Sequence, residues 1–408
     1  MKFFKDTNIG LILILVASVC LLSGCGTLRH AVPSRLQSQA QISGMPDVRA
    51  FADVYNEVIQ EDLIQSAAQE PEGAYEIRNG AKIYSILSIS GGSANGAYGA
   101  GLLKGWSASG TRPNFKIVSG ISTGALIAPV AFLGSDYDYI IEEFYTTVST
   151  KDIMKKKSVL AMMFGDSFAS NKPLAKIIKN MVTKEILAAI TEEYNKGRRL
   201  YVGTANLDAQ RLVLWDMGKI ASMGDDESLE LFRKVLLTAA AIPAAFPPSF
   251  FEVKVDGEKY DEMHVDGSTV TQVFSLYGVL DGAVKEARDR GIASQEKKID
   301  FFVIRNGYIY PAWQEVGDSI PDIAGRSLDT VINANGIGDI FRLYVFSKER
   351  GVNFYYAYIP VEGESLAEEM FDPREMKRLF DMGYEKAKAG YPWKTEPPSL
   401  QHLREHKD

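Results

Sequence analysis

The sequence Gly-Ile-Ser-Thr-Gly at residues 120–124 is the feature that most constrains this 408-residue chain. It follows directly on an apolar run at residues 115–118, as expected for a strand that turns sharply into a helix. At such a turn Ser122 is presented as a nucleophile, and the flanking glycines leave room for the tight backbone. A five-residue pattern with three fixed positions also recurs by chance, so other motifs must agree with it.

A glycine-rich segment lies upstream, where residues 90–96 read Ser-Gly-Gly-Ser-Ala-Asn-Gly after a strand-like run at residues 83–89. Backbone N–H groups at a strand-to-helix junction form a pocket for anions. A serine hydrolase needs such a pocket, because negative charge develops on the carbonyl oxygen of its tetrahedral intermediate. A nucleotide site is the alternative. It is disfavoured because no Gly-Lys-Ser or Gly-Lys-Thr follows, and the later glycines lack the G-x-G-x-x-G spacing.

A candidate base follows in the sequence Val-Asp-Gly-Ser at residues 265–268, which contains Asp266. It comes after residues 251–263, for which the turn residues Asp256 and Gly257 predict a β-hairpin. An isolated Asp-Gly pair is more often only another turn. The assignment of Asp266 as a base therefore depends on the other motifs.

The histidines bear on the choice between a triad and a simpler dyad, since a Ser-His-Asp triad needs one in the folded body. The chain has four, and three of them lie in a polar linker or a charged tail: His30, His402 and His406. His264 remains, two residues before Asp266, and in an extended strand both side chains point to the same side. From the residues alone, Ser122 either uses Asp266 directly or acts through His264.

Taken together, these motifs resemble those of the patatin-like phospholipases, in which a glycine-rich loop, a G-x-S-x-G turn and a D-G-[GA] motif occur in this order. Two further segments resemble that family: residues 201–215 (YVGTANLDAQRLVLW) and residues 237–248 (LTAAAIPAAFPP). The resemblance covers residues 83–307. It implies a three-layer α/β sandwich with a mostly parallel central sheet and helices on both faces. The alternation of strand-like and helical segments along the chain agrees with this fold.

The resemblance also implies a mechanism, catalysis by a Ser-Asp dyad without histidine. Ser122 would attack an acyl ester and Asp266 would accept its proton. The N–H groups around Gly91, Gly92 and Ser93 would stabilise the oxyanion, and water would later release the acid from the acyl-enzyme. No metal and no cofactor are expected.

Several residues depart from the family pattern. Ser90 stands where the family has Asp, Ser93 replaces the third glycine, and Asn95 replaces the usual Arg or Lys. The loop can still present backbone donors, so the changes put in question only the positive charge normally near the oxyanion. Pro129 lies in the helix expected after Ser122 and should kink or shorten it.

The amino terminus predicts a bacterial lipoprotein. Two lysines precede an apolar run at residues 9–22 that is too short to span a bilayer, and the sequence Leu-Ser-Gly-Cys ends it at Cys25. This resembles a lipobox, so residues 1–24 are expected to be a signal peptide. Cys25 is expected to carry palmitate or a similar acyl chain and to anchor the protein in the cell envelope. An ordinary secretory signal is the alternative. By resemblance to enterobacterial sorting, Gly26 suggests the outer membrane.

Charge and cysteine content exclude several partners. The formal net charge of −7 argues against nucleic acid. Removal of the signal peptide would discard Cys20 and leave Cys25 as the only thiol, so neither an intramolecular disulfide nor a cysteine metal site is expected.

The rest of the chain is expected to form one large domain with additions at both ends. Residues 25–46 are polar and predict a lipidated cysteine followed by a tether, and residues 47–80 predict an added helix. Residues 81–395 are the expected patatin-like catalytic domain, and residues 396–408 a charged tail. Residues 155–168 combine three lysines with apolar side chains and suit a lipid interface or lid, although a buried corner is the commoner structure.

The expected function is carboxylic ester hydrolysis in lipid degradation, namely release of fatty acids from phospholipids or lysophospholipids, as by a phospholipase A or a lysophospholipase. The membrane, reached through Cys25, is the expected partner. An apolar cleft that includes residues 126–132 is expected to accept the acyl chain. The alternatives are a hydrolase of small esters or thioesters, an acyltransferase on the same site, or a lipoprotein that keeps the fold as a non-catalytic platform.

Overall fold

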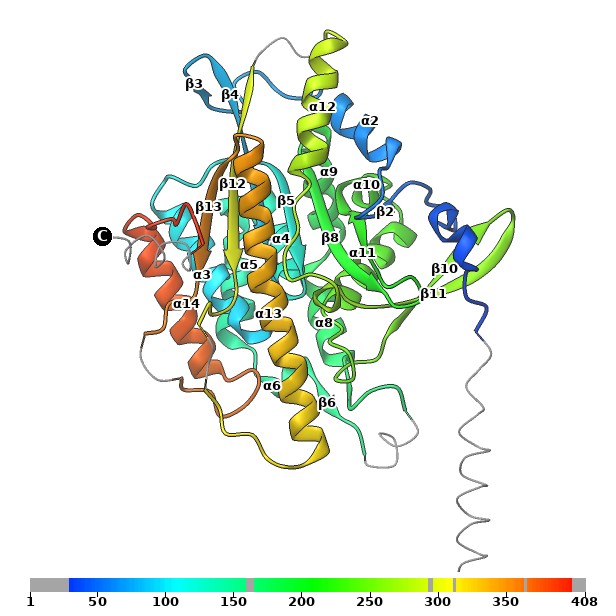
Figure 1. Cartoon of the computed structure of the whole chain (residues 1–408), viewed down its shortest axis with the longest axis vertical. Coiled ribbons are helices and arrows are strands. Elements are labelled where there is room, and N and C mark those ends of the chain that lie inside the picture. Colours follow the sequence, from blue (N-terminus) through cyan, green and yellow to red (C-terminus); the bar gives the residue numbers. More distant parts are fainter. Residues whose placement is uncertain (1–28, 159–164, 293–295, 311–312, 363–364, 398–408) are drawn as a thin grey trace, which may run out of the picture.

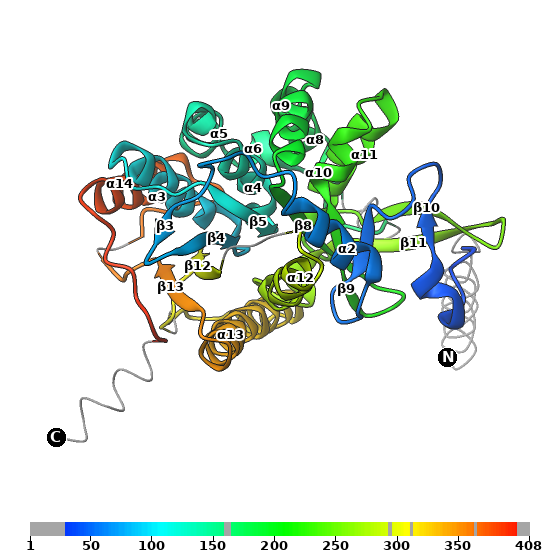
Figure 2. The same cartoon turned by 90° about the horizontal axis from the view of Figure 1, so that it is seen from above.

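The computed structural model describes residues 29–158, 165–292, 296–310, 313–362 and 365–397. The predicted signal peptide, Cys25 and most of the predicted tail lie outside these residues, as do residues 159–164. The described chain forms a large sheet with helices on both faces, as expected from the sequence (Figure 1 and Figure 2).

The centre of this sheet is parallel, with strands in the order β8-β5-β4-β12-β13. The pairings of β8 with β5, β5 with β4, β4 with β12 and β12 with β13 are all parallel. These strands are mostly buried, which explains their near-continuous apolar sequences. Their bounds are β4 (Ala81–Ile89), β5 (Phe115–Ile121), β8 (Arg199–Asn206), β12 (Lys297–Arg305) and β13 (Asn353–Tyr358).

Antiparallel strands extend the sheet beyond β8. Strand β11 pairs with both β8 and β10, and β9 pairs with β8. The predicted hairpin is confirmed, since Val255 pairs with Glu258 and the turn residues Asp256 and Gly257 both have positive φ angles. The remaining short strands join at the edges. The bounds are β1 (Gln41–Ile42), β2 (Arg49–Phe51), β3 (Ile77–Arg78), β9 (Arg211–Asp216), β10 (Ser249–Val255) and β11 (Glu258–Asp266), with β6 (Lys155–Lys156) and β7 (Ala169–Ser170) forming a separate pair.

The helices form two layers, each with its own apolar core against the sheet. In Figure 2, α12 and α13 lie below the sheet and most other helices lie above it. The lower layer consists of α2 (Glu57–Ser66), α12 (Tyr277–Asp289) and α13 (Ile320–Glu349). The upper layer consists of α3 (Gly96–Ala108), α4 (Thr123–Leu133), α5 (Asp138–Thr147), α6 (Thr150–Ile153), α8 (Lys172–Met181), α9 (Lys184–Asn195), α10 (Met217–Ser222), α11 (Asp226–Ala239) and α14 (Pro373–Lys388).

The expected tether over residues 25–46 is wrong from Arg29 onward, because this segment is docked on the body. Arg29 donates hydrogen bonds to Asp261 at 2.7 Å and to Asp208 at 2.8 Å. Strand β1 then pairs with β10, and the side chains of Val32 and Met45 are buried in the core. The sequence did not predict this docking because its apolar residues are isolated and follow no helical or strand period.

The expected helix near residues 47–64 begins later than the sequence indicated. Phe51 belongs to β2, which pairs with β9, and the helix α2 starts at Glu57. Asn56 caps it, since its side chain accepts a hydrogen bond from the Ile59 N–H. Across the residues described, none of the helices has the length and apolar character needed to cross a membrane.

Candidate active site

Ser122 lies at the turn between β5 and α4, as the motif predicted. Its φ of 54° and ψ of −125° are rarely adopted by residues other than glycine. The neighbouring glycines are required by close backbone contacts: a Cβ on Gly124 would lie 2.3 Å from the carbonyl oxygen of Ile89, and one on Gly120 would lie 2.2 Å from that of Gly124. Helix α4 continues past Pro129 to Leu133, so the proline does not end it.

Asp266 is brought to Ser122 by the register of the sheet. Strands β5 and β11 both pair with β8, but they run in opposite directions along it. The last residue of β5 pairs with Gly203, and the last residue of β11, Asp266, pairs with the next residue, Thr204. The two strands therefore meet end to end beside β8, and the residues at their ends, Ser122 and Asp266, come together.

The carboxyl group of Asp266 is buried and only partly hydrogen-bonded. Oδ1 accepts a hydrogen bond from the Ser268 N–H at 2.8 Å, whereas Oδ2 accepts none of standard geometry from the described residues. Burial raises the pKa of Asp266 to about 6, and proximity of the Ser122 hydroxyl lowers it in part. The Ser122 hydroxyl is thus close to the carboxyl without an aligned bond, as is common in an unliganded site.

The glycine-rich loop lies beside the nucleophile. A Cβ on Gly91 would lie 3.1 Å from the Cβ of Ser122. The Gly91 N–H, however, donates to the carbonyl oxygen of Gln272 at 3.1 Å and is not free to bind an oxyanion in this conformation. Within the described ranges, the N–H groups of Gly92 and Ser93 donate to no other group. Of the three backbone N–H groups expected to bind the oxyanion, those of Gly92 and Ser93 thus remain available in this conformation.

Two residues that the sequence analysis missed, Asn306 and Gln272, hold this loop. Asn306 donates from its backbone N–H to Ser90 Oγ and from Nδ2 to the Ser90 carbonyl, both at 2.9 Å, and its Oδ1 accepts from the Gly99 N–H at 3.1 Å. Ser90 thus serves as a buried anchor point in place of the family aspartate. In the sequence, Asn306 is marked only as a polar residue that follows the last residue of β12, Arg305.

His264 belongs to a different cluster. Its Nδ1 is 2.9 Å from Thr204 Oγ1 and its Nε2 is 3.1 Å from Glu262 Oε2. Glu262 also forms an ion pair with Arg49 of β2. Both ring nitrogens are therefore engaged away from Ser122, and burial lowers the pKa of His264. The structure brings Ser122 together with Asp266 and leaves His264 apart.

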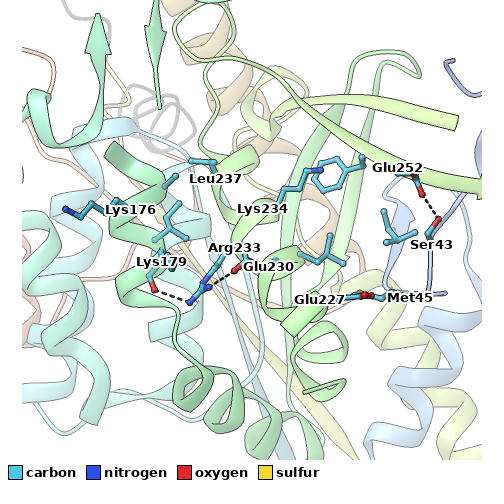
Figure 3. A pocket seen from close by; sticks show the side chains of 15 residues that line it. Ser43, Met45, Lys176, Lys179, Glu227, Glu230, Arg233, Lys234, Leu237 and Glu252 are labelled. Atoms are coloured by element: carbon cyan, nitrogen blue, oxygen red, sulfur yellow. Dashed lines mark hydrogen bonds and ion pairs between the residues drawn. The ribbon is translucent and has the colours of Figure 1, made fainter. Parts of the chain in front are cut away.

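The cavities are not where the sequence placed the acyl cleft. The cavity at residues 126–133 of α4 has a volume of about 20 Å³, too small for an acyl chain, so that expectation is wrong for this conformation. A cavity of about 710 Å³ lies between the docked N-terminal segment, α8 and α11, with Ser43, Lys179 and Arg233 in its wall (Figure 3); its lining includes neither Ser122 nor Asp266.

Another cavity, of about 640 Å³, lies beside the loop that follows Asp266. Val270, Val273 and Phe274 line it from that loop, and Leu343 and Phe346 line it from α13. Its wall is largely apolar, as a site for an acyl chain requires, but its lining, like that of the first cavity, includes neither Ser122 nor Asp266. Within the described ranges, no group of three or more histidine, cysteine, aspartate or glutamate side chains could hold a metal ion.

Comparison with known proteins agrees with this geometry. Residues 87–277 match the family model described as patatin-like phospholipase. No curated protein matches the sequence. Among solved structures, the chain is similar to VipD from Legionella pneumophila, with 14% identity and a TM-score of 0.33, over 75% of this chain and 66% of the VipD chain. The family match supports a lipid acyl hydrolase in general. Over residues 87–277, this chain is therefore similar to the patatin-like phospholipases.

Proposed function

We propose that this protein is a serine acyl hydrolase that releases fatty acids from phospholipids or lysophospholipids through the dyad Ser122 and Asp266. The observation that carries this proposal is the end-to-end meeting of β5 and β11 on one edge of β8, which places the two side chains beside the glycine-rich loop. The local geometry supports the roles: a strained turn presents the Ser122 hydroxyl, and among the described residues none donates a hydrogen bond of standard geometry to Oδ2 of Asp266.

In the proposed reaction, Ser122 Oγ attacks the ester carbonyl while Asp266 takes the hydroxyl proton. The N–H groups of Gly92 and Ser93 bind the oxyanion, and each such donor contributes about 3 kcal/mol. Asp266 then gives the proton to the leaving alkoxide, which departs as the lysolipid or glycerol derivative. A water molecule, deprotonated by Asp266, attacks the acyl-serine. Asp266 then gives this proton to Ser122 Oγ as the fatty acid leaves, which restores the free enzyme. The raised pKa of Asp266 makes it a stronger base than an ordinary aspartate while leaving it ionised at pH 7.

We further propose that the protein acts at an envelope membrane, anchored through a lipidated Cys25, in the outer membrane by the Gly26 criterion. Arg29 is already docked on Asp208 and Asp261. Only three residues separate Cys25 from Arg29, and this stretch of chain can span at most about 14 Å. The anchor would therefore hold the body close to the lipid surface, where substrate is concentrated.

Labelling with a fluorophosphonate probe tests the nucleophile. The wild-type chain should be labelled and the Ser122→Ala variant should not be labelled. Fatty-acid release from phospholipid and lysophospholipid should be lost in the same variant and should not require added calcium. Absence of labelling together with absence of fatty-acid release from either lipid would contradict the proposal and favour the non-catalytic platform.

Incorporation of labelled palmitate tests the anchor separately. The wild-type chain should take up label and fractionate with membranes, whereas Cys25→Ala should take up none and should keep its signal peptide. Equal incorporation in both chains would overturn the proposed anchor while leaving the hydrolase proposal intact.

A further inference from the structure

The first half of α13, residues 320–331, differs from the rest of that helix. The second half packs on the sheet through buried Ile340, Leu343 and Tyr344. In the first half nearly every described side chain is exposed, and Figure 1 shows this part extending past the body at the lower end of the molecule. Ile320 is 84% exposed and Val331 is 63% exposed. Helices of soluble proteins normally bury such residues.

The exposed apolar residues of this half-helix form one stripe. At 100° per residue, Ile320, Ile323, Leu328 and Val331 fall within an arc of about 140°. The charged residues fall on the other side of the helix: Asp322, Arg326 and Asp329. The half-helix is thus amphipathic, yet its apolar stripe is exposed rather than packed.

The segment just before α13 also carries exposed apolar side chains, and it contacts the charged side of the half-helix, where Arg326 donates a hydrogen bond to Gln314 at 3.2 Å. Trp313 is 88% exposed, and Val316 is also exposed. We name these two residues together with the four apolar residues of the stripe the α13 apolar surface. Several exposed large apolar side chains on one half-helix and the segment before it are typical of a binding face.

Other features at the same end of the molecule indicate what this surface binds. The parallel strands run toward the lower end in Figure 1, so the turn that carries Ser122 faces that end, and β6 lies there too. Lys155 and Lys156 of β6 are exposed, and so is Phe168, whose carbonyl oxygen accepts a hydrogen bond from the Lys157 N–H. The lower end of the molecule in Figure 1 therefore carries both exposed apolar side chains of α13 and exposed lysines of β6.

We propose that the α13 apolar surface docks on a phospholipid bilayer. Exposed tryptophan is typical of the membrane interface, and the lysines of β6 complement anionic headgroups. The short connection between Cys25 and Arg29 keeps the body near the bilayer. This inference rests on the proposed function as a hydrolase of membrane lipids, and it adds the orientation in which the site meets its substrate.

Trp313 is a native reporter for the test. The chain has four tryptophans, of which Trp106 and Trp215 are buried and Trp393 is half-buried. The full-length Ser122→Ala chain is reconstituted in vesicles of phosphatidylethanolamine and phosphatidylglycerol that contain a phosphatidylcholine with brominated acyl chains. The serine substitution prevents lipid hydrolysis during the measurement. Bromine should quench a fraction of the fluorescence, and this fraction should disappear in the Trp313→Phe variant.

A matched pair of variants separates docking from a general effect of charge. Ile323 and Ile77 are both 51% exposed, but Ile77 lies on β3 at the opposite end of the molecule. Ile323→Asp should weaken bromine quenching and, in the active chain, reduce fatty-acid release from vesicles by about tenfold or more, because it places a charge within the apolar stripe that docks on the bilayer. Hydrolysis of a soluble nitrophenyl ester should not change. Ile77→Asp should change none of the three.

Two results would overturn the docking proposal. In the first, brominated lipid does not quench the fluorescence of Trp313, while the active chain hydrolyses soluble esters. This result would leave the proposed function intact. In the second, Trp313 becomes protected from acrylamide without lipid as protein concentration rises, which assigns the surface to a second copy of the chain. If bromine quenches Trp313 as predicted but the wild-type chain does not hydrolyse the soluble ester, the proposed function alone would be contradicted.

Discussion

Two buried carboxyl groups on β11 have opposite electrostatic environments. Glu262 and Asp266 lie four residues apart, on the same side of the strand, and both are inaccessible to solvent. Burial raises the pKa of Glu262, but hydrogen bonds from His264 and Arg49 outweigh it and bring the pKa to about 2. Burial raises the pKa of Asp266 to about 6, and within the described residues no cation pairs with it.

This difference separates a structural carboxylate from a reactive one. Glu262 is paired with a cation and bonded through both oxygens, so it joins the docked N-terminal segment to β11. Within the part of the chain that the structure describes, one oxygen of Asp266 accepts no hydrogen bond of standard geometry, and the fold carries the cost of burying its charge. A buried carboxyl group with a raised pKa is typical of an acid–base site.

Removal of Arg49, the cation paired with Glu262, should produce the largest loss of stability. Arg49→Ala leaves Glu262 buried without its ion pair, which should cost about 3–5 kcal/mol in the free energy of unfolding. Urea denaturation at pH 7 measures it. The double variant Arg49→Met with Glu262→Met should recover at least half of this loss. A cost below about 1 kcal/mol for the single variant would contradict a structural role for the pair.

Substitution of Asp266 should raise the free energy of unfolding, whereas substitution of Arg49 lowers it. A folded-state pKa of about 6 in place of 3.8 means that the folded protein binds more protons between these values, so its stability falls as pH rises through this window. Asp266→Asn removes the buried charge and should stabilise the protein at pH 8 by up to about 3 kcal/mol, but hardly at pH 3.5. Denaturation curves at the two pH values measure this. Equal or lower stability of the variant at pH 8 would contradict it.

The pH dependence of kcat/KM should follow the same carboxyl group. Only the ionised form of Asp266 can accept the proton of Ser122. The rate constant on a soluble ester should therefore rise about tenfold per pH unit below pH 6 and level off above it. His264→Ala should keep this profile, because the pKa of buried His264 is lowered and its ring faces Glu262. A limb near pH 7 that disappears in His264→Ala would assign the base to the histidine.

The smallest effect concerns the residue that holds the glycine-rich loop. Asn306→Ala removes two side-chain hydrogen bonds, from Nδ2 to the Ser90 carbonyl oxygen and from the Gly99 N–H to Oδ1. It should lower kcat about tenfold with little change in KM, since the loop serves the oxyanion rather than the bound ester. Asn306→Asp, which keeps the acceptor for Gly99 but loses the donor to Ser90, should fall between wild type and alanine. A change in KM alone would contradict a role in the oxyanion loop.

The sequence predicted those features that depend on local patterns. The strand-turn-helix at Ser122, the hairpin with Asp256 and Gly257 and the buried parallel strands are each written in consecutive residues. Features that depend on distant partners were missed. Asn306 donates a hydrogen bond to Ser90, which lies 216 residues away in the sequence, and the Gly91 N–H donates to the Gln272 carbonyl oxygen. The segment after Arg29 docks through isolated apolar residues. No local pattern carries such contacts.

Comparison of kcat/KM for Asp266→Asn and His264→Ala on one soluble ester tests the central claim most directly. Both residues are buried on the same strand, so both substitutions disturb the same region. The account predicts that Asp266→Asn lowers kcat/KM about 10³-fold while remaining folded, and that His264→Ala retains most of the activity, because only Asp266 takes the proton from Ser122. The reverse pattern, with His264 indispensable and Asp266 replaceable, would contradict the dyad.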